Sequence, residues 1–325
     1  MTVDAKHAIH TAVPAKSAWQ RGRLLALGSV VVALLLVAHD YVPNRWGNIG
    51  SLVQSFLPWL GLAVPLGILA ALLRRSALAI LTVLLPLAAW TGVFLPQVRP
   101  AEPGPSDLVV VQHNVSDTST DVAGTAEVIL AAGPDVVTLT EVSAATAEQY
   151  TRTFGETLPH HETQGTVGIW SKYPLDGAQA VDIRPQGVDA TWDRCLRVAI
   201  QRDGASVAVF VAHLPSVRLG RDGFETELRN ASALRLADAI HAERSGTVIV
   251  SGDLNAVLAD DAIAPLTGLV TAPSTGFEFT YPAVFPVVQI DHVLARGATV
   301  TEVSALGRTG SDHLPVVARL DTPWS

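Results

Sequence analysis

The sequence is poor in cysteine and in charged side chains. It contains a single cysteine, Cys195, so no disulfide can form within the chain. Only 16% of its 325 residues are charged, whereas 49% are hydrophobic, and the mean hydropathy is +0.33. This balance is too apolar for one ordinary soluble domain, and the length allows a folded domain together with membrane segments.

Charge is absent from three apolar runs near the amino terminus, at residues 24–38, 52–73 and 77–95. A membrane helix without ionisable side chains offers no pathway for ions or protons, which argues against a transporter. The first run is short and follows basic residues, as in a signal peptide, but the two later runs favour three transmembrane helices within residues 24–96.

Basic residues indicate the orientation of these helices. They precede the first run, and Arg74 and Arg75 separate the second run from the third. Cytoplasmic loops are enriched in such residues, so we expect a multi-pass protein of the cell membrane with a cytoplasmic tail at residues 1–23. Three crossings would place a proline-rich linker, residues 97–106, and a domain at residues 107–325 outside the cytoplasm.

The domain after the apolar runs is strongly acidic. Residues 1–100 carry 8 Lys+Arg and 2 Asp+Glu, which leaves 14 and 28 of the totals of 22 and 30 for residues 101–325, a net charge of −14. Proteins that bind nucleic acid usually present a basic surface to the phosphates, so nucleic acid is an unlikely partner.

Polar side chains follow the ends of several predicted strands in this domain. Residues 247–250 predict a buried strand that ends at Ser251 and Gly252, and Asp253 and Asn255 come directly after it. Two residues apart in an extended backbone, these side chains would point the same way. Similar positions at or near other strand ends are held by Asn114, Glu141, His213, Asp291, Asp312 and His313.

These residue types suit one kind of chemistry. Carboxylate and amide oxygens are the ligands that Mg²⁺ or Mn²⁺ prefers, whereas two histidines in this set and one cysteine are too few for a thiolate or tris-imidazole zinc site. Histidines could transfer protons or stabilise negative charge. The set therefore predicts metal-assisted hydrolysis of a phosphate ester or anhydride.

Seven short segments in order resemble the endonuclease/exonuclease/phosphatase superfamily. The resemblance covers nearly all of residues 107–320 and implies an α/β fold, a four-layer α/β/β/α sandwich of the DNase I-like kind. The segments are QHNV (112–115), TEV (140–142), GIWSKYPL (168–175), AHLPS (212–216), SGDLNA (251–256), IDHVL (290–294) and GSDHLPV (310–316).

The resemblance also implies a metal site. Glu141 would be the principal ligand of Mg²⁺ or Mn²⁺, assisted by Asn114 and Asp312. The basic residues Arg194 and Arg197 could reach a second phosphate, but we expect them to be solvated residues at a strand edge.

Catalytic roles follow from the same resemblance. Asp253 would position or deprotonate the attacking water, and Asn255 would orient the phosphate. His313, paired with Asp291, and His213 would stabilise the charge on the phosphate or serve the leaving group.

Membrane anchoring ahead of such a domain makes a lipid phosphate the expected substrate. The arrangement is similar to the VanJ teicoplanin-resistance group, which implies an undecaprenyl-diphosphate phosphatase of cell-wall lipid recycling. Three alternatives stay open: a surface-anchored nuclease, a phospholipase C of the sphingomyelinase type, and an inactive module that binds a lipid or antibiotic. The oligomeric state does not follow from the sequence.

Overall fold

The computed structural model describes residues 17, 19, 21–98, 104–272 and 276–324. It divides the chain into two compact units, the first formed by Met1–Ala38 and Pro58–Val93 and the second by His39–Leu57 and Phe94–Ser325. Most of the expected cytoplasmic tail and half of the expected linker lie outside the described residues.

The first unit is helical. Ser76 caps the fourth helix, because its Oγ accepts a hydrogen bond from the backbone N–H of Ala79 at 3.2 Å. Helix α1 packs against both α3 and α4, and Trp90 Nε1 donates to the carbonyl of Pro58 at 2.8 Å. The helices are α1 (Arg23–Val37), η2 (Leu57–Leu62), α3 (Ala63–Leu73), α4 (Ala77–Thr82) and α5 (Leu84–Val98), the last of which continues into the second unit.

The expectation of three transmembrane helices is not supported. Among the described helices, one continuous stretch, Ala77–Val98, is long and apolar enough to cross a membrane, at 22 residues. The second apolar run is split into Ile49–Ser55 and Leu57–Leu73, which are bent by 68°. Helix α1 has 15 residues and falls short of a full span.

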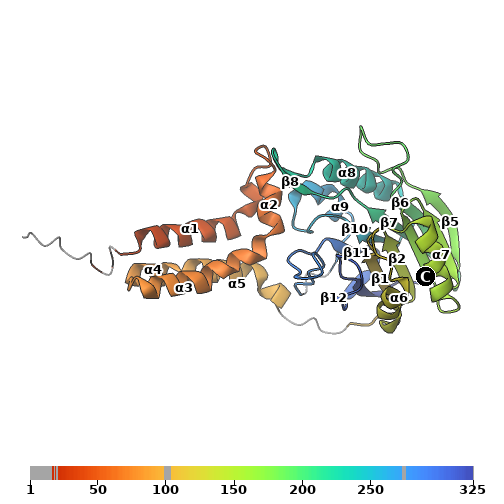
Figure 1. Ribbon diagram of the computed structural model, residues 1–325, viewed down its shortest axis with the longest axis horizontal. Helices are drawn as coiled ribbons and strands as arrows, with labels where there is room; N and C mark the ends of the chain where they lie inside the picture. The colour runs from red at the N-terminus through yellow and green to blue at the C-terminus, as the bar shows by residue number, and fades with distance from the viewer. Residues whose placement is uncertain (1–16, 18, 20, 99–103, 273–275, 325) are drawn as a thin grey trace, which may run out of the picture. The chain divides into compact units, whose positions relative to one another are not determined.

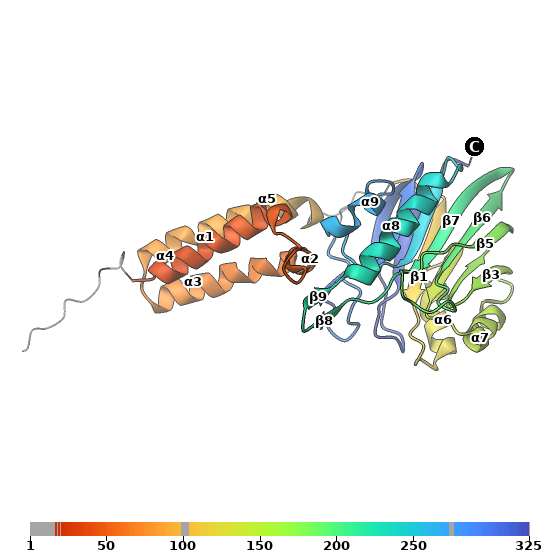
Figure 2. The same cartoon turned by 90° about the horizontal axis from the view of Figure 1, so that it is seen from above.

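The second unit contains two sheets that lie face to face (Figures 1 and 2). Strands of one sheet contact strands of the other across this interface. The six-stranded sheet, in spatial order, contains β12 (Thr299–Ala305), β13 (Val316–Asp321), β1 (Leu108–Asn114), β2 (Val136–Thr140), β4 (Val167–Ser171) and β3 (His160–Gln164). The five-stranded sheet contains β11 (Asp291–Arg296), β10 (Val248–Asp253), β7 (Ala205–His213), β6 (Cys195–Arg202) and β5 (Leu175–Ala180). A separate hairpin consists of β8 (Arg218–Gly220) and β9 (Gly223–Glu225).

Three apolar clusters give the unit its layers. One fills the space between the sheets, with Val110 and Ile169 from one sheet and Val209 and Ile249 from the other. A second joins the outer face of the six-stranded sheet to helices α6 (Val122–Ala131) and α7 (Ala144–Phe154). The third joins the five-stranded sheet to α8 (Glu227–Ala242), η3 (Asp261–Ile263) and α9 (Ala264–Thr267). The expected four-layer α/β/β/α sandwich is therefore present.

Local signals in the sequence account for the boundaries of several elements. Asp121 begins α6, and its Oδ1 accepts from the N–H of Gly124 at 2.9 Å. Ser143 begins α7 with a capping box that it shares with Thr146. The strand expected at residues 247–250 is β10, which continues to Asp253.

The second unit includes a segment from between the apolar helices, residues 39–57, with η1 (His39–Tyr41) and α2 (Ile49–Ser55). Ser51 Oγ donates to Asp260 Oδ1 at 2.9 Å, and Gln54 Nε2 donates to Asp261 Oδ2 at 2.7 Å. Asp260 also pairs with the buried Arg229 at 2.6 Å. These polar contacts explain why α2 is not part of a continuous apolar helix.

Candidate active site

Five strand ends from the two facing sheets meet at one rim. In the first sheet, Asn114 ends β1 and lies beside Thr140, which ends β2 directly before Glu141. In the second sheet, Asp253 at the end of β10 has His213 and Asp291 as its register partners on the neighbouring strands. The topology thus brings together side chains from five separate parts of the chain.

A hydrogen bond between the sheets connects the two halves of this rim. Asn114 Nδ2 donates to Asp253 Oδ2 at 3.0 Å, and both residues are buried. The Asn114 Oδ1 accepts from the N–H of Ser116 at 3.0 Å, while the Asp253 Oδ1 accepts from the N–H of Asn255 at 2.9 Å. These bonds fix the orientation of the Asp253 carboxylate.

His313 and Asp291 form a buried pair. His313 Nδ1 lies 2.8 Å from Asp291 Oδ2, and His313 Nε2 lies 3.9 Å from Asp253 Oδ2. Burial alone would lower the pKa of His313, but the charge of Asp291 and the hydrogen bond to it raise that pKa to about 9. The imidazole is therefore a cation at neutral pH, and its Nε2–H faces the site.

His213 has the opposite charge state. Burial, followed by the charge of Arg194, lowers its pKa to about 3. Because the ring is neutral, its contacts of 3.7 Å to Glu141 and 3.7 Å to Asp253 are not ion pairs. Arg194 Nη1 lies 3.1 Å from Nδ1 and 3.4 Å from Nε2. A guanidinium only donates, so the shorter contact assigns the acceptor to Nδ1 and the proton to Nε2, towards the two carboxylates.

The carboxyl group of Asp253 has a pKa far above its usual range. Burial and the neighbouring charge of Asp291 raise its pKa to about 7, although the charge of His313 and the hydrogen bonds from Asn114 and Asn255 oppose this. The charge of Asp291 raises both this pKa and that of His313, and neighbouring groups with strongly perturbed pKa values are typical of catalytic sites. Here the pair is the His313 cation and the Asp253 carboxylate.

The rim fits a divalent cation. Carboxylate oxygens of Asp253 and Asp291 lie within 4.8 Å of each other; the protonated His313 beside them has no nitrogen lone pair to bind a cation. The buried Asp291 Oδ1 has no hydrogen-bond partner in the described part of the chain. The Glu141 carboxylate is 30% exposed, and its residue has a φ of 61°, a strained value for a glutamate. A concentration of carboxylate oxygens with one oxygen unpaired suits a hard cation.

The other expected site residues are placed differently. Asp312 is exposed, and its carboxylate makes no hydrogen bond or ion pair with other described residues. Asn255 has a φ of 48°, so the backbone is not extended there, and its Nδ2 donates to the carbonyl of Leu214 at 3.0 Å. The assumption that Asp253 and Asn255 share one orientation by strand alternation is therefore wrong.

Sequence reasoning missed two contributors to the site. Ser311 Oγ donates to the carbonyl of Asn114 at 2.6 Å and accepts from the N–H of His313 at 3.0 Å. These bonds hold the loop that carries His313 against β1. Arg194 was expected to be solvated, but it lies half-buried beside His213. The available signal was its position directly before the apolar strand β6.

Several solved structures have folds similar to that of this chain. Sphingomyelinase C from Streptomyces griseocarneus has a TM-score of 0.50 and 22% identity, covering 66% of this chain and 99% of its own. A beta toxin variant from Staphylococcus aureus with bound magnesium ions has a TM-score of 0.51 and 19% identity, with coverages of 66% and 99%. A mannosyl-6-phosphatase from Bacteroides thetaiotaomicron has a TM-score of 0.52 and 16% identity, with coverages of 66% and 100%.

No curated protein matches this chain in sequence. The similarity to solved structures, at these identities, concerns the fold. A family profile is more specific, since residues 111–313 match the Endonuclease/Exonuclease/phosphatase family, whose members are metal-dependent phosphoester hydrolases. That match begins within β1 and ends at His313, so it spans the strand ends that form the rim. The chain therefore belongs to the Endonuclease/Exonuclease/phosphatase family.

Proposed function

We propose that this protein is a membrane-anchored phosphohydrolase that removes the terminal phosphate of a polyprenyl diphosphate, with undecaprenyl diphosphate as the expected substrate. Such a reaction recycles the lipid carrier of cell-wall synthesis and affects susceptibility to teicoplanin. The observation that carries the hydrolase part is the buried pair of Asp253 and His313, whose carboxylate and imidazole lie 3.9 Å apart with pKa values displaced towards neutrality and above it.

The residues divide the reaction between them. Asp253 accepts a proton from water as the water oxygen forms a bond to the terminal phosphorus. The bond from that phosphorus to the bridging oxygen breaks, and the released products are inorganic phosphate and the polyprenyl monophosphate. His313 supplies positive charge and a proton from Nε2 to the leaving oxygen, while Asp291 holds its Nδ1 at 2.8 Å. Asn255 orients the phosphate, and the Nε2–H of His213 stabilises its negative charge.

Glu141 would hold the metal together with Asn114, with Asp312 as a weaker contributor. A bound Mg²⁺ or Mn²⁺ supplies positive charge at the phosphate oxygens. Mg²⁺ is the ion we propose, because the donors are carboxylate and amide oxygens.

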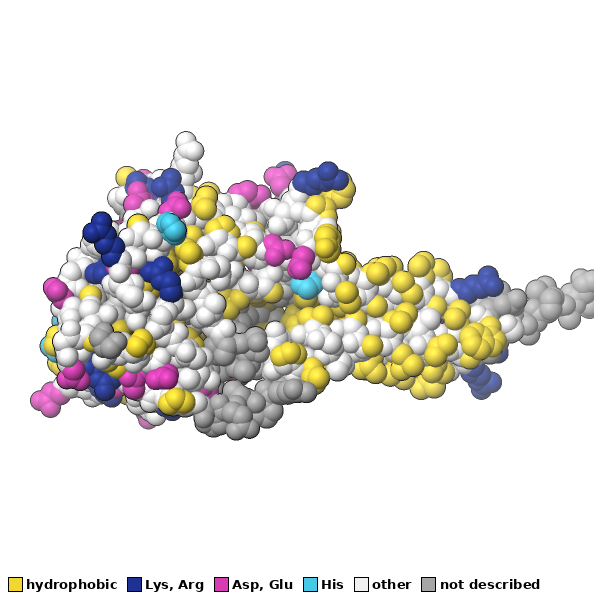
Figure 3. Space-filling view, turned by 180° about the vertical axis from the view of Figure 1, so that it is seen from behind, with side chains coloured by type: hydrophobic (Ala, Val, Ile, Leu, Met, Phe, Trp, Pro, Cys, Tyr) yellow, Lys and Arg dark blue, Asp and Glu magenta, His cyan; other side chains and the backbone are white. Residues whose placement is uncertain are grey.

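The membrane anchor is supported by the surface of the first unit. Figure 3 shows apolar side chains over the surface of its helices. A contiguous apolar surface of this kind is rare on soluble proteins. Anchored there, with the amino terminus in the cytoplasm, the catalytic unit would act on lipids at the outer face. The leucines that are more than half exposed include Leu24, Leu27, Leu34, Leu66, Leu69 and Leu72.

Phosphate release from undecaprenyl diphosphate tests the proposal. The full chain is purified in detergent, and free phosphate is measured with Mg²⁺ and with excess chelator. We expect release that depends on the metal and falls by a factor of about 100 or more in Asp253→Ala and His313→Ala. Equal release by wild type and both variants would reject the proposal.

A phospholipase C of the sphingomyelinase type is the second candidate, favoured by the fold similarity to sphingomyelinase C. Release of phosphocholine from sphingomyelin in the same detergent would identify that activity. Cleavage of plasmid DNA tests a nuclease, which the net charge of residues 101–325 disfavours. An inactive binding module would show no turnover of any phosphate ester.

A further inference from the structure

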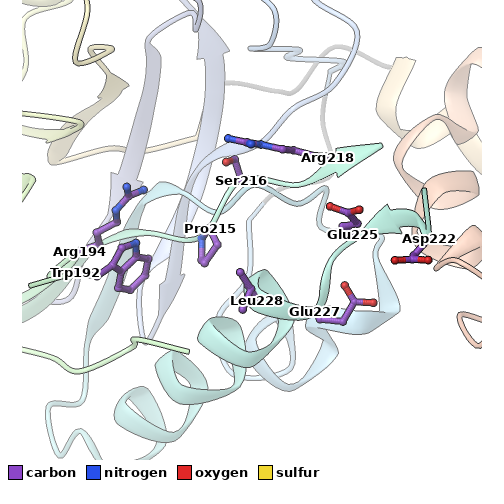
Figure 4. A pocket seen from close by; sticks show the side chains of 9 residues that line it. All are labelled: Trp192, Arg194, Pro215, Ser216, Arg218, Asp222, Glu225, Glu227 and Leu228. Atoms are coloured by element: carbon purple, nitrogen blue, oxygen red, sulfur yellow. The ribbon is translucent and has the colours of Figure 1, made fainter. Parts of the chain in front are cut away.

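A cavity of about 560 Å³ opens beside the catalytic rim, and Arg194 belongs to both. Figure 4 shows Arg194 and Trp192 at one end of this cavity and three carboxylates at the other. Pro215 and Leu228 line it between the two ends. The remaining lining residues are Ser216, Arg218, Asp222, Glu225 and Glu227.

Arg194 is a half-buried cation without a carboxylate partner. Its guanidinium makes no ion pair with the other described residues, and its hydrogen bonds are to the ring of His213, 3.1 Å to Nδ1. The guanidinium also lies 5.1 Å from the ring centre of Trp192, a cation–π contact that holds it in place. The N–H groups on Nε and Nη2 of Arg194 are therefore available to donate to a ligand.

Arg197, which lies within the strand β6 that follows Arg194, is not equivalent. Its Nε donates to Glu243 Oε2 at 2.8 Å, and both side chains are largely buried, so its charge is already compensated. The structure thus distinguishes two arginines that the sequence leaves equal. Only Arg194 of this pair faces both the catalytic histidine and the cavity.

We propose that Arg194 selects a diphosphate: its guanidinium binds the phosphate adjacent to the one that is hydrolysed, at the basic end of the cavity. The planar fork of an arginine matches two phosphate oxygens, and its position beside His213 places it one group away from the reacting phosphate. Carboxylates at the far end repel an anion, and Arg218, the other cation among the described lining residues, makes no hydrogen bond with His213, so the Arg194 end is the one next to the reacting phosphate. This inference rests on the proposed function and names its specificity residue.

Binding of two small phosphonates tests the role of Arg194 without any lipid. The full chain in detergent is titrated calorimetrically with methylenediphosphonate and with methylphosphonate at the same free Mg²⁺ concentration. We expect the wild type to bind the diphosphonate about 30-fold more tightly, because a charge-assisted bidentate contact contributes on the order of 2 kcal/mol. In Arg194→Ala this preference should fall to about 3-fold or less, with methylphosphonate binding unchanged, and Arg194→Lys should retain part of it.

The control is Arg197→Gln, which should keep the full preference. The proposal is overturned if Arg194→Ala keeps it as well. It is also overturned if Arg194→Ala and Arg194→Lys lose both ligands, since Arg194 would then hold the reacting phosphate, or if phosphocholine binds more tightly than the diphosphonate, since the acidic end would then select a cationic headgroup. A retained preference without phosphate release from undecaprenyl diphosphate would reject the lipid substrate alone.

Discussion

At the scale of single residues, two histidines approach the same carboxylate but differ in charge. His213 and His313 lie 3.7 Å and 3.9 Å from Asp253. His313 is protonated because Asp291 is its partner, whereas His213 is neutral because burial and Arg194 disfavour its charge. One neighbour therefore decides whether an imidazole at this rim is an acid or a neutral donor.

This difference predicts the pH dependence of hydrolysis. His313 acts as a cation, so its contribution persists below its pKa of about 9 and is lost as the pH rises through that value. Asp253 acts as a base, so activity is lost as the pH falls below its pKa, which lies at about 7 without metal. Asp291→Asn removes a cause that raises both pKa values, and both limbs of the rate profile should shift down by about one unit or more.

Phosphate release measured at a fixed reaction time across the pH range gives both the acidic and the alkaline limb of the rate profile. His313→Ala is the comparison, since it should lack the alkaline limb altogether. An alkaline limb that stays at the same pH in Asp291→Asn would show that His313 is not the acid.

The Mg²⁺ requirement of two variants ranks the expected metal ligands Glu141 and Asp312. Glu141→Gln should raise the Mg²⁺ concentration for half-maximal activity by about 10-fold to 100-fold, because a carboxylate ligand is lost. Asp312→Asn changes an exposed carboxylate that makes no hydrogen bond or ion pair with other described residues. It should change the Mg²⁺ concentration for half-maximal activity by less than about 3-fold. Magnesium titration of the two variants after chelator treatment measures this, and a larger effect at Asp312 would reverse the assignment.

At the scale of elements, helix α2 has an unexpected position. Its apolar composition suggested the start of a membrane helix, but Ser51 and Gln54 bond to Asp260 and Asp261 in the catalytic unit. Asp260 in turn neutralises Arg229, which is 1% exposed. A buried ion pair depends on every hydrogen bond that satisfies it. The catalytic unit is therefore built from two separate parts of the sequence.

Ser51→Ala tests this contribution of α2. Loss of the 2.9 Å bond leaves a buried Asp260 oxygen with one partner fewer, so we expect the free energy of unfolding to fall by about 1–3 kcal/mol. The turnover number should stay unchanged, because the catalytic rim is formed by other strands. Ser55→Ala is the matched control, since the Ser55 hydroxyl bonds only within its own helix, to the carbonyl of Ser51 at 2.8 Å. Denaturant unfolding followed by fluorescence measures both, and equal effects would contradict the prediction.

At the scale of the whole molecule, the number of membrane crossings decides where the catalytic unit works. Three crossings from a cytoplasmic amino terminus place it outside, whereas two would return it to the cytoplasm. The structure contains one helix of spanning length and one bent pair among the described residues. The proposed outer location holds if the long helix crosses alone; if the bent pair crosses too, the short helix α1, with 15 residues, must cross as well.

Cysteine labelling can locate the catalytic unit. Cys195, the single cysteine, is fully buried, and burial raises the pKa of its thiol, so it should not react in the folded protein. Glu148→Cys introduces a thiol on a helix surface where the glutamate side chain is 77% exposed. We expect a membrane-impermeant maleimide to label this variant in intact cells and to leave the wild type unlabelled. Labelling only after lysis would place the unit in the cytoplasm.

Several element boundaries and most of the candidate rim could be predicted from the sequence alone, whereas the four-layer sandwich was implied by the family resemblance. Helix caps such as Asp121 act over a few residues, so they can be recognised without tertiary information, whereas β10 continues through Ser251-Gly252 to Asp253. The positions of Asn114, His213 and Asp253 followed from strand ends in the same way, because a sheet brings its strand ends to one edge.

Which of these residues touch, and which of them carry a charge, depends on the folded molecule. The separation of Arg194 from Arg197, the exposure of Asp312 and the docking of α2 all depend on neighbours far away in sequence. The pKa values depend on them too, because desolvation and Coulomb interactions act through space and not along the chain. Sequence patterns report local backbone preferences, and these long-range terms are absent from them.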